Sequence, residues 1–335
     1  MNSFLIVRLG SLGDVIHGIP VAAALRAEYP RARIDWMVEP RYVDLLNLVT
    51  GIDRRIPVDT RGIFTGGRGR FRETLRELRR LHYDAAIDLQ GLLKSAVLAR
   101  LVKARMTIGF PREHLREPLA RYFYTHKPNP GDATHVVYKN LKLLRPLQVD
   151  DRRLQFPLEI PRTAVVDSVV DRFGGYALIN PGAAWPNKRW PPDRFGAVAR
   201  AVFEQFGLRS IVLWGPGEQP LAQSVVAASG GSAELSPPTT IVDLVGLARG
   251  AQLMISGDTG PLHIAGAVGT PIVALFGPTY AERNGPWGLF DITISRTEQC
   301  ACHYRRQCTR AEPCIDDIGV EEVILAVRRR LGLHE

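Results

Sequence analysis

The sequence predicts an α/β fold in two domains, each built around a parallel β-sheet. With 335 residues the chain exceeds one ordinary domain and suits two of about 150 to 170 residues. Short apolar runs recur along it, each followed by a glycine-containing turn and a helical pattern, as in βαβ units. The segment 253–276 shows this order most fully, with the apolar run LMI, the turn GDTG, a helix from Pro261 and the strand IVALF. Ligands of such folds bind at the carboxyl edge of the sheet, so the turns at strand ends hold the functional candidates.

The first such turn follows a predicted strand at 4–9 and has the sequence GSLGD. A helix is expected after it, to about Tyr29, with a bend where Gly18 and Pro20 interrupt the pattern. The spacing GxxGD is neither a dinucleotide fingerprint nor a P-loop. A carboxylate at this place is unfavourable for phosphate and suited to proton transfer, so Asp14 is a candidate general base; a helix cap is an equally good interpretation.

The rest of the first half continues the alternation and is rich in arginine. Predicted strands lie at 33–38, 84–89 and 106–109, and predicted helices at 71–81, 92–102 and 135–147. Asp88 and Gln90 stand at a strand end, where ligand groups belong. A segment in which arginines interleave with the aromatic residues 122–124 is interpreted either as a lipid-facing patch or as a solvated charged face.

The second half begins after a charged, proline-containing linker at 148–162. Strands are expected at 176–180 and 209–214, and helices at 192–206, 240–248 and 320–331. Three strand-end turns, PGAAWPNK, WGPGE and GDTGPLH, are predicted to share one sheet edge. They would bring together Lys188, which suits phosphate, Glu218, which suits ribose hydroxyls, and His263, which adds a donor. The alternative is an ordinary turn in which Asp258 or Thr259 caps the helix and His263 packs in the core.

The charge of the chain is uneven. Residues 1–150 carry a net charge of +10 and the remainder −1, so the first half alone calls for an acidic partner: a nucleic acid, an anionic membrane or a charged glycolipid. A nucleic-acid-binding or nucleotide-sensing protein ranks well behind, because no helix-turn-helix, RRM or KH motif is present. No apolar run reaches the length of a membrane span, and the run at 4–7 is too short for a signal peptide, so a cytoplasmic location is expected.

All cysteines of the chain stand within fifteen residues. Their spacing, CxCx5Cx5C, lacks the CxxC pairs of zinc ribbons. A structural metal and a loop clamp of reduced or oxidised thiols both remain open. The members of this possible structural cluster are Cys300, Cys302, Cys308 and Cys314.

Five motifs together resemble glycosyltransferase family 9, the bacterial lipopolysaccharide heptosyltransferases. They are LGSLGD (9–14), DLQGLLKSA (88–96), REPLA (116–120), KRWPPDRF (188–195) and DTGPLHIA (258–265). The resemblance spans nearly the whole chain and is greatest to heptosyltransferase I, which adds the first heptose to the Kdo of the inner core; the cysteine cluster is more similar to heptosyltransferase II. A related family 9 enzyme with another donor or acceptor, such as the heptosyltransferase II type, is the alternative.

This resemblance implies a GT-B architecture, in which two Rossmann-like domains face each other across a cleft. The implied domains are 1–155 for the acceptor and 156–315 for the nucleotide sugar, with a C-terminal helix in 316–335 packing back on the first domain. The chemistry is inverting, with no metal and no cofactor. The implied partners are an ADP-heptose donor, an anionic acceptor of the Kdo-lipid A type and the surface of the inner membrane, which the protein would meet peripherally from the cytoplasm.

The site residues that the resemblance implies fall into three groups. Asp14 matches the catalytic base, Lys188 matches a phosphate-binding lysine, and Glu218 corresponds to a ribose contact. One departure is the pair Ala183 and Ala184, where relatives often have hydroxyl residues, so that only backbone donors remain. The implied nucleotide-diphosphate loop consists of Asp258, Thr259, Gly260 and His263. The candidate acceptor contacts, taken from the basic first half, are Arg61, Arg68, Arg70 and Arg116.

Overall fold

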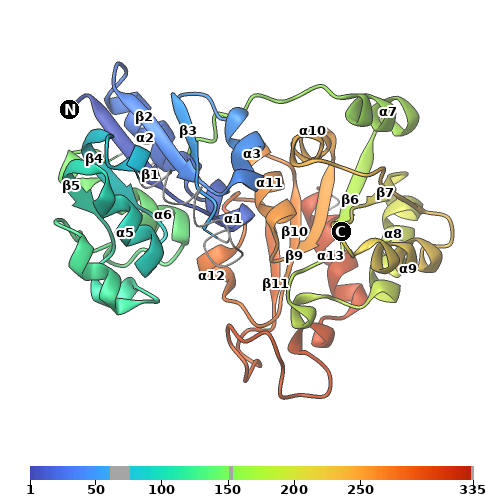
Figure 1. Ribbon diagram of the computed structural model, residues 1–335. Coiled ribbons are helices and arrows are strands. Elements are labelled where there is room, and N and C mark those ends of the chain that lie inside the picture. The colour runs from blue at the N-terminus through green and yellow to red at the C-terminus, as the bar shows by residue number, and fades with distance from the viewer. Residues whose placement is uncertain (61–75, 151–153, 333–335) are drawn as a thin grey trace. The chain divides into compact units, whose positions relative to one another are not determined.

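The computed structural model describes residues 1–60, 76–150 and 154–332. The chain divides into two compact units, Met1–Glu159 and Ile160–Glu335 (Figure 1). The division falls inside the stretch that the sequence predicts as a linker. Each unit contains one parallel β-sheet, as the alternating pattern of the sequence predicts.

The first unit is built on a five-stranded sheet in the order β3-β2-β1-β4-β5. Every pairing in it is parallel, with Val7 of β1 opposite both Met37 and Asp88. The inner strands are almost fully buried because helices cover both faces. The strands are β1 (Ser3–Val7), β2 (Arg33–Val38), β3 (Arg54–Pro57), β4 (His82–Asp88) and β5 (Lys103–Ile108).

The long helix expected after β1 is two helices, α1 and α2, which meet at Gly18. Pro20 stands in the first turn of α2, where its missing N–H costs nothing. Gly18 is required by close packing, since a Cβ there would lie 2.8 Å from Cη2 of Trp36. The helices of this unit are α1 (Leu12–Ile16), α2 (Ile19–Glu28), α3 (Val43–Asn47), α5 (Leu93–Leu101) and α6 (Val136–Lys142), with short 3₁₀ turns η1 (Pro40–Tyr42), η2 (Arg112–His114), η3 (Pro118–Phe123) and η4 (Arg145–Leu147).

The second unit is built on a six-stranded sheet in the order β11-β10-β9-β6-β7-β8. Its pairings are also parallel. Sequence patterns alone did not identify the two short edge strands, β8 and β11. The strands are β6 (Tyr176–Asn180), β7 (Arg209–Val212), β8 (Ala233–Leu235), β9 (Leu253–Gly257), β10 (Ile272–Phe276) and β11 (Ile292–Ser295).

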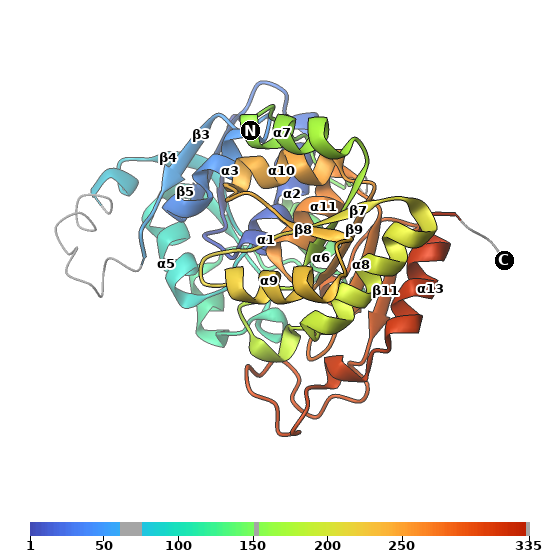
Figure 2. The ribbon, with the colours of Figure 1, turned by 90° about the vertical axis from the view of Figure 1, so that its right-hand side faces the viewer.

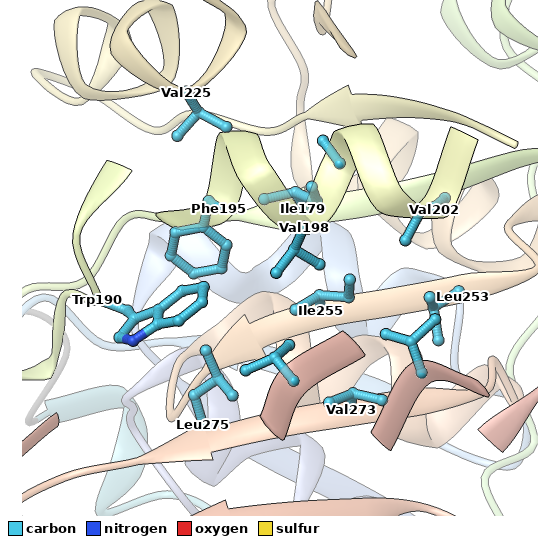
Figure 3. Packing of buried hydrophobic residues seen from close by; sticks show 14 of the residues in the cluster. Ile179, Trp190, Phe195, Val198, Val202, Val225, Leu253, Ile255, Val273 and Leu275 are labelled. Atoms are coloured by element: carbon cyan, nitrogen blue, oxygen red, sulfur yellow. The ribbon is translucent and has the colours of Figure 1, made fainter. Parts of the chain in front are cut away.

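Helix α8 supplies much of the core of this unit. Figure 3 shows Phe195, Val198 and Val202 on its inner face, directed at the apolar side chains of β6, β9 and β10. Trp190 packs edge-on against Phe195 with ring centroids 4.9 Å apart. The helices are α7 (Ala164–Phe173), α8 (Pro192–Phe206), α9 (Gln219–Ala228), α10 (Ile241–Gly250), α11 (Gly260–Val268), α12 (Ala281–Asn284) and α13 (Val320–Arg330), with 3₁₀ turns η5 (Pro186–Lys188) and η6 (Cys314–Asp317).

The last helix, α13, belongs to the second unit. It lies beside α8 (Figure 2) and buries Val323, Ala326 and Val327 in the core of that unit. Its apolar face is therefore occupied, so a packing of α13 on the first unit would have to use its polar face and stays a prediction. Among the helices of the described residues, none is both long enough and apolar enough to span a bilayer.

Candidate active site

Both sheets have a topological switch point, where the strand order reverses direction. In the first unit it lies between β1 and β4, and in the second between β6 and β9. Open α/β sheets bind ligands outside the carboxyl ends of the strands at this point. Asp14 follows β1, Lys188 follows β6 and Asp258 follows β9. The topology thus places one group of predicted site residues at the switch point of each unit.

In the first unit, Asp14 forms an ion pair with Arg8. Asp14 Oδ1 contacts Nη2 of Arg8, and Oδ2 accepts hydrogen bonds from the Ser11 backbone N–H at 2.9 Å and the Ser11 hydroxyl at 3.1 Å. Asp14 therefore performs the capping role that the sequence left open. Its side chain nevertheless remains 37% exposed, whereas that of Arg8 is only 7% exposed. A carboxylate has about four acceptor positions, so these contacts leave room for a further hydrogen bond.

The ion pair favours the ionised form of Asp14. Burial acts to raise the pKa of Asp14, but the Arg8 guanidinium and the hydrogen bonds from Ser11 outweigh it and lower that pKa. The carboxylate is therefore ionised at neutral pH and can accept a proton.

The turn after β4 supports this arrangement. Asp88 is fully buried and accepts hydrogen bonds from the hydroxyls of Tyr124 at 2.7 Å and Ser95 at 2.8 Å. Gln90 uses its side-chain oxygen to accept the Leu9 backbone N–H at 2.8 Å. The expectation that Asp88 is a ligand group is therefore wrong, because both of its carboxylate oxygens accept hydrogen bonds from neighbouring residues of the same unit. Together Asp88 and Gln90 fix the turn whose Leu89 carbonyl accepts a hydrogen bond from Arg8.

In the second unit, Asp258 contacts two of the residues that the sequence predicts for a nucleotide site, Lys188 and His263. Its Oδ2 accepts hydrogen bonds from Nζ of Lys188 at 2.6 Å and from the hydroxyl of Thr279 at 2.7 Å. Nε2 of His263 lies 3.5 Å from Oδ1. Burial acts to raise the pKa of Asp258, but His263 and Lys188 hold it well below its usual range. Asp258 is thus a fixed anion that orients a lysine and a histidine.

The start of α11 adds backbone donors beside this cluster. Thr259 is the N-cap residue and Gly260 the first residue of the helix, so the unpaired N–H groups of the first turn lie here. The Thr259 hydroxyl accepts a hydrogen bond from Asn180 at 3.0 Å and lies 3.1 Å from that of Ser256. These bonds tie the ends of β6 and β9 together at the switch point.

Glu218 lies on the turn after β7 and is held by its neighbours. Its Oε2 accepts the Gly215 backbone N–H at 3.2 Å, and Oε1 lies 3.8 Å from Nη2 of Arg189. A Cβ at position 182 would lie 2.2 Å from Glu218 Oε2, so Gly182 is needed for this placement. Lys188 and His263 thus meet at Asp258, while Glu218 is paired with Arg189.

For the remaining predicted residues the structure shows fewer contacts or none. Arg61, Arg68 and Arg70 lie outside the described residues. Arg116 is exposed between η2 and η3. The cysteines 300, 302, 308 and 314 form one cluster. Among the described residues, the His, Cys, Asp and Glu side chains form no group of three or more that could hold a metal ion.

Three residues that contact the predicted site residues were missed by sequence reasoning. Arg8 lies within the strand predicted at 4–9 and was given no role, because the sequence does not show that its side chain is buried beside Asp14. Thr279 stands in the turn GPT after β10, and Asn180 ends β6 immediately before PG. The sequence signal for Asn180 and Thr279 was a polar residue at or just after the carboxyl end of an apolar strand.

Comparison with known proteins decides the family. The model of glycosyltransferase family 9 (heptosyltransferase) matches residues 71–313. The chain belongs to glycosyltransferase family 9. This glycosyltransferase is 29% identical over 320 residues to lipopolysaccharide heptosyltransferase 1 of Pseudomonas aeruginosa, covering 91% of this chain and 87% of the relative. It is also 29% identical over 337 residues to lipopolysaccharide heptosyltransferase 3 of Escherichia coli, covering 95% and 96%.

The fold of this family 9 enzyme agrees with that of solved heptosyltransferases. The structure of E. coli heptosyltransferase WaaC with ADP matches with a TM-score of 0.74 and 25% identity, covering 88% of this chain and 93% of that one. WaaC with ADP-2-deoxy-2-fluoro heptose matches with a TM-score of 0.72, also at 25% identity, covering 87% and 92%. The enzyme therefore has the GT-B fold, with a parallel α/β sheet in each of its two units.

Proposed function

We propose that this enzyme transfers heptose from ADP-L-glycero-D-manno-heptose to the Kdo region of the lipopolysaccharide inner core. The observation that carries the proposal is the cluster at the β6/β9 switch point, where Asp258 orients Lys188 and His263 beside the start of α11. Cationic and backbone donors at such a point suit a nucleoside diphosphate. The nucleotide identity is supported by WaaC, a relative whose solved structures contain ADP and an ADP-heptose analogue.

In this proposal the donor diphosphate binds Lys188, His263 and the backbone N–H groups that open α11. Asp258 does not touch the phosphates, because its own charge would repel them; it holds the two side chains in place. Glu218 accepts the ribose hydroxyls. As the sugar–phosphate bond breaks, negative charge grows on the leaving ADP, and Lys188 with the helix start stabilises it.

Asp14 is the proposed general base. The acceptor hydroxyl attacks the anomeric carbon from the face opposite the diphosphate, so configuration inverts. As the new C–O bond forms and the bond to ADP breaks, the hydroxyl proton passes to the Asp14 carboxylate. The lowered pKa keeps this carboxylate ionised, and the transfer becomes favourable when the attacking oxygen acquires positive charge in the transition state.

The acceptor side of the proposal rests on the basic first half. Kdo carboxylates and lipid A phosphates are anionic and match the net charge of +10 in residues 1–150. Arg61, Arg68, Arg70 and Arg116 are the proposed contacts, of which Arg116 is exposed. Such an acceptor would bring the enzyme to the cytoplasmic face of the inner membrane as a peripheral protein.

The direct test follows release of ADP from ADP-L-glycero-D-manno-heptose, with and without Kdo2-lipid A, in EDTA. We expect release that depends on the acceptor and survives the chelator. Binding of ADP without acceptor-dependent release would retain the nucleotide site and overturn the acceptor assignment. Failure to bind ADP at all would overturn the donor site.

A second acceptor is favoured by one specific observation, the similarity to heptosyltransferase 3 at the same level of identity. In that case the enzyme would add heptose to a different lipopolysaccharide acceptor from the one proposed above. Assaying Kdo2-lipid A beside its mono- and diheptosylated forms separates the two, because the true acceptor should give the largest kcat/KM.

A further inference from the structure

Two apolar side chains of the first unit project into solvent from a segment rich in arginine. Leu119 is 62% exposed and Tyr122 is 69% exposed, both in the 3₁₀ turn η3. A 3₁₀ helix has three residues per turn, so these two side chains lie in one row on the same face. Ala120 and Phe123 form the next row, and Ala120 is fully buried. One face of η3 therefore packs on the unit, while another presents apolar side chains to water.

The inner side of this segment is fixed by hydrogen bonds and packing. The Tyr124 hydroxyl donates to the buried Asp88 at 2.7 Å. The Leu93 N–H, in the first turn of α5, donates to Oε2 of Glu117 at 2.6 Å. Leu115, between η2 and η3, is buried. These contacts hold η3 and its apolar row in a defined place beside α5.

Cationic side chains surround the apolar row. Nη2 of Arg121 donates a hydrogen bond to the Tyr122 hydroxyl at 2.7 Å, and the Arg121 guanidinium carbon lies 4.6 Å from the centroid of the Tyr122 ring. This hydrogen bond lowers the pKa of Tyr122, and the charge of Arg112 acts in the same direction, so both guanidinium groups lie near the hydroxyl. Arg116 is exposed before η3, and Lys94 is exposed in the first turn of α5.

We propose that η3 and the cations around it dock the enzyme on an anionic phospholipid bilayer, with Leu119 and Tyr122 inserted among the lipid headgroups. Tyrosine is enriched at this depth of a membrane because its ring is apolar and its hydroxyl is polar. Arginine can lay its stem along apolar material and keep its guanidinium at the lipid phosphates. Each arginine near an anionic membrane surface strengthens binding about fivefold.

Charge favours this surface over another exposed apolar pair in the second unit. Leu289 is 89% exposed and Phe290 is 76% exposed, just before β11. The net charge of residues 151–335 is −1, however, whereas that of residues 1–150, which contain η3, is +10. An anionic bilayer attracts the second of these charges, so the pair at 289–290 serves as a control for η3.

The docking surface lies at the edge of the sheet that also carries the proposed base. The turns η2 and η3 follow the carboxyl end of β5, and α5 follows that of β4. Asp14 follows β1, whose carboxyl end is at the same edge of this parallel sheet. Docking through η3 would bring this edge toward the lipid that anchors a Kdo-lipid A acceptor. In this respect the inference rests on the proposed function.

The test measures co-sedimentation of the full-length protein with vesicles, in the absence of lipid A and nucleotide. The wild type should bind vesicles of phosphatidylethanolamine and phosphatidylglycerol at least about tenfold more strongly than vesicles of phosphatidylethanolamine and phosphatidylcholine. The double substitution Leu119→Ser with Tyr122→Ser should weaken binding to the anionic vesicles about tenfold. Leu289→Ser with Phe290→Ser, which removes a more exposed apolar pair, should bind as the wild type does.

Arg121→Gln keeps the test decisive if the double variant of η3 fails to fold. It should weaken binding to the anionic vesicles about fivefold. Arg31→Gln removes the same charge from an exposed site before β2, at the opposite edge of the sheet, and should leave binding unchanged.

Several results would overturn the proposal. They are a wild type that binds neither kind of vesicle or both equally, and equal losses in the η3 variants and their controls. Binding that requires lipid A in the vesicle would assign the surface to the acceptor instead. Light scattering that shows a dimer in the wild type and a monomer in the double variant of η3 would assign it to a second copy of the chain.

Turnover separates this proposal from the proposed function. The double variant of η3 should keep the wild-type kcat/KM for a water-soluble, deacylated Kdo acceptor and lose about tenfold only with Kdo2-lipid A in anionic vesicles. An equal loss with both acceptors would place Leu119 and Tyr122 in the acceptor site and overturn the docking proposal. A wild type that binds the anionic vesicles but transfers no heptose would overturn the proposed function and leave the docking surface in place.

Discussion

The two switch points differ in which partner of the ion pair is the more exposed. In the first unit the cation is buried and the anion accessible, since the side chain of Arg8 is 7% exposed and that of Asp14 37%. In the second unit the anion is the more buried partner, with Asp258 at 7% and Lys188 at 15%. The same fold therefore presents a carboxylate at one switch point and a cation at the other. The first can accept a proton and the second can bind phosphate, although both sites begin as a salt bridge.

The largest expected effect comes from removing the accessible carboxylate. Asp14→Asn should lower turnover by about 10²- to 10⁴-fold, because the amide cannot accept the hydroxyl proton. Binding of ADP, measured by calorimetry, should be unchanged. Asp44→Asn, another acid in the first turn of a short helix, is the control.

Wild-type turnover in a folded Asp14→Asn protein would show that this residue only caps α1. Circular dichroism and thermal melting belong to the same experiment, since the substitution leaves Arg8 buried without its anionic partner.

Removing the cation of the second switch point should have the next largest effect. Lys188→Ala is expected to lower kcat/KM about 10²-fold and to weaken ADP binding, because one fixed charge at the leaving diphosphate is lost. Arg200→Ala, on the exposed side of α8, removes the same charge without touching the site. An unchanged ADP affinity would contradict the phosphate assignment.

A pH profile sharpens the comparison further. Arg8 lowers the pKa of Asp14, so Arg8→Gln should raise that pKa and move the acid limb of kcat/KM to higher pH. The loss should be several-fold at mildly acidic pH and should shrink as pH rises and Asp14 ionises. Arg8→Lys, which retains the charge, should stay closer to the wild type. A loss that is equal at all pH values would indicate that Arg8 only stabilises the fold.

Sequence patterns predicted the parts of the molecule that depend on local signals. The boundaries of α8 and β6 agree with the structure because Pro192 and Gly207 delimit the helix and the strand is an unbroken apolar run. The edge strands β8 and β11 were missed, since three or four mixed residues give no clear period.

The side-chain pairings inside the site depend on tertiary contacts, so they could not be predicted from the sequence. Lys188 and Asp258 stand seventy positions apart, and their meeting follows only once β6 and β9 are known to be neighbours. Arg8 was missed because the turn at 88–91, which orients it, is itself fixed by buried Asp88. The residue types at strand ends were predictable, but which of them pair was not.

The smallest expected effect tests how closely the second switch point is packed. Gly182→Ala would place a methyl group 2.2 Å from the present position of Glu218 Oε2, so the carboxylate must move. Losing one hydrogen bond to the ribose should raise the KM for the donor about three- to tenfold while kcat changes little. Gly319→Ala, where a Cβ meets open space, is the matched control.

An unchanged KM would mean that Glu218 does not touch the nucleotide, whereas a fall in kcat alone would show that the turn also positions Lys188. Because Lys188 is anchored separately by Asp258, we expect the KM effect alone, which would mark binding and leaving-group stabilisation as distinct tasks of neighbouring turns.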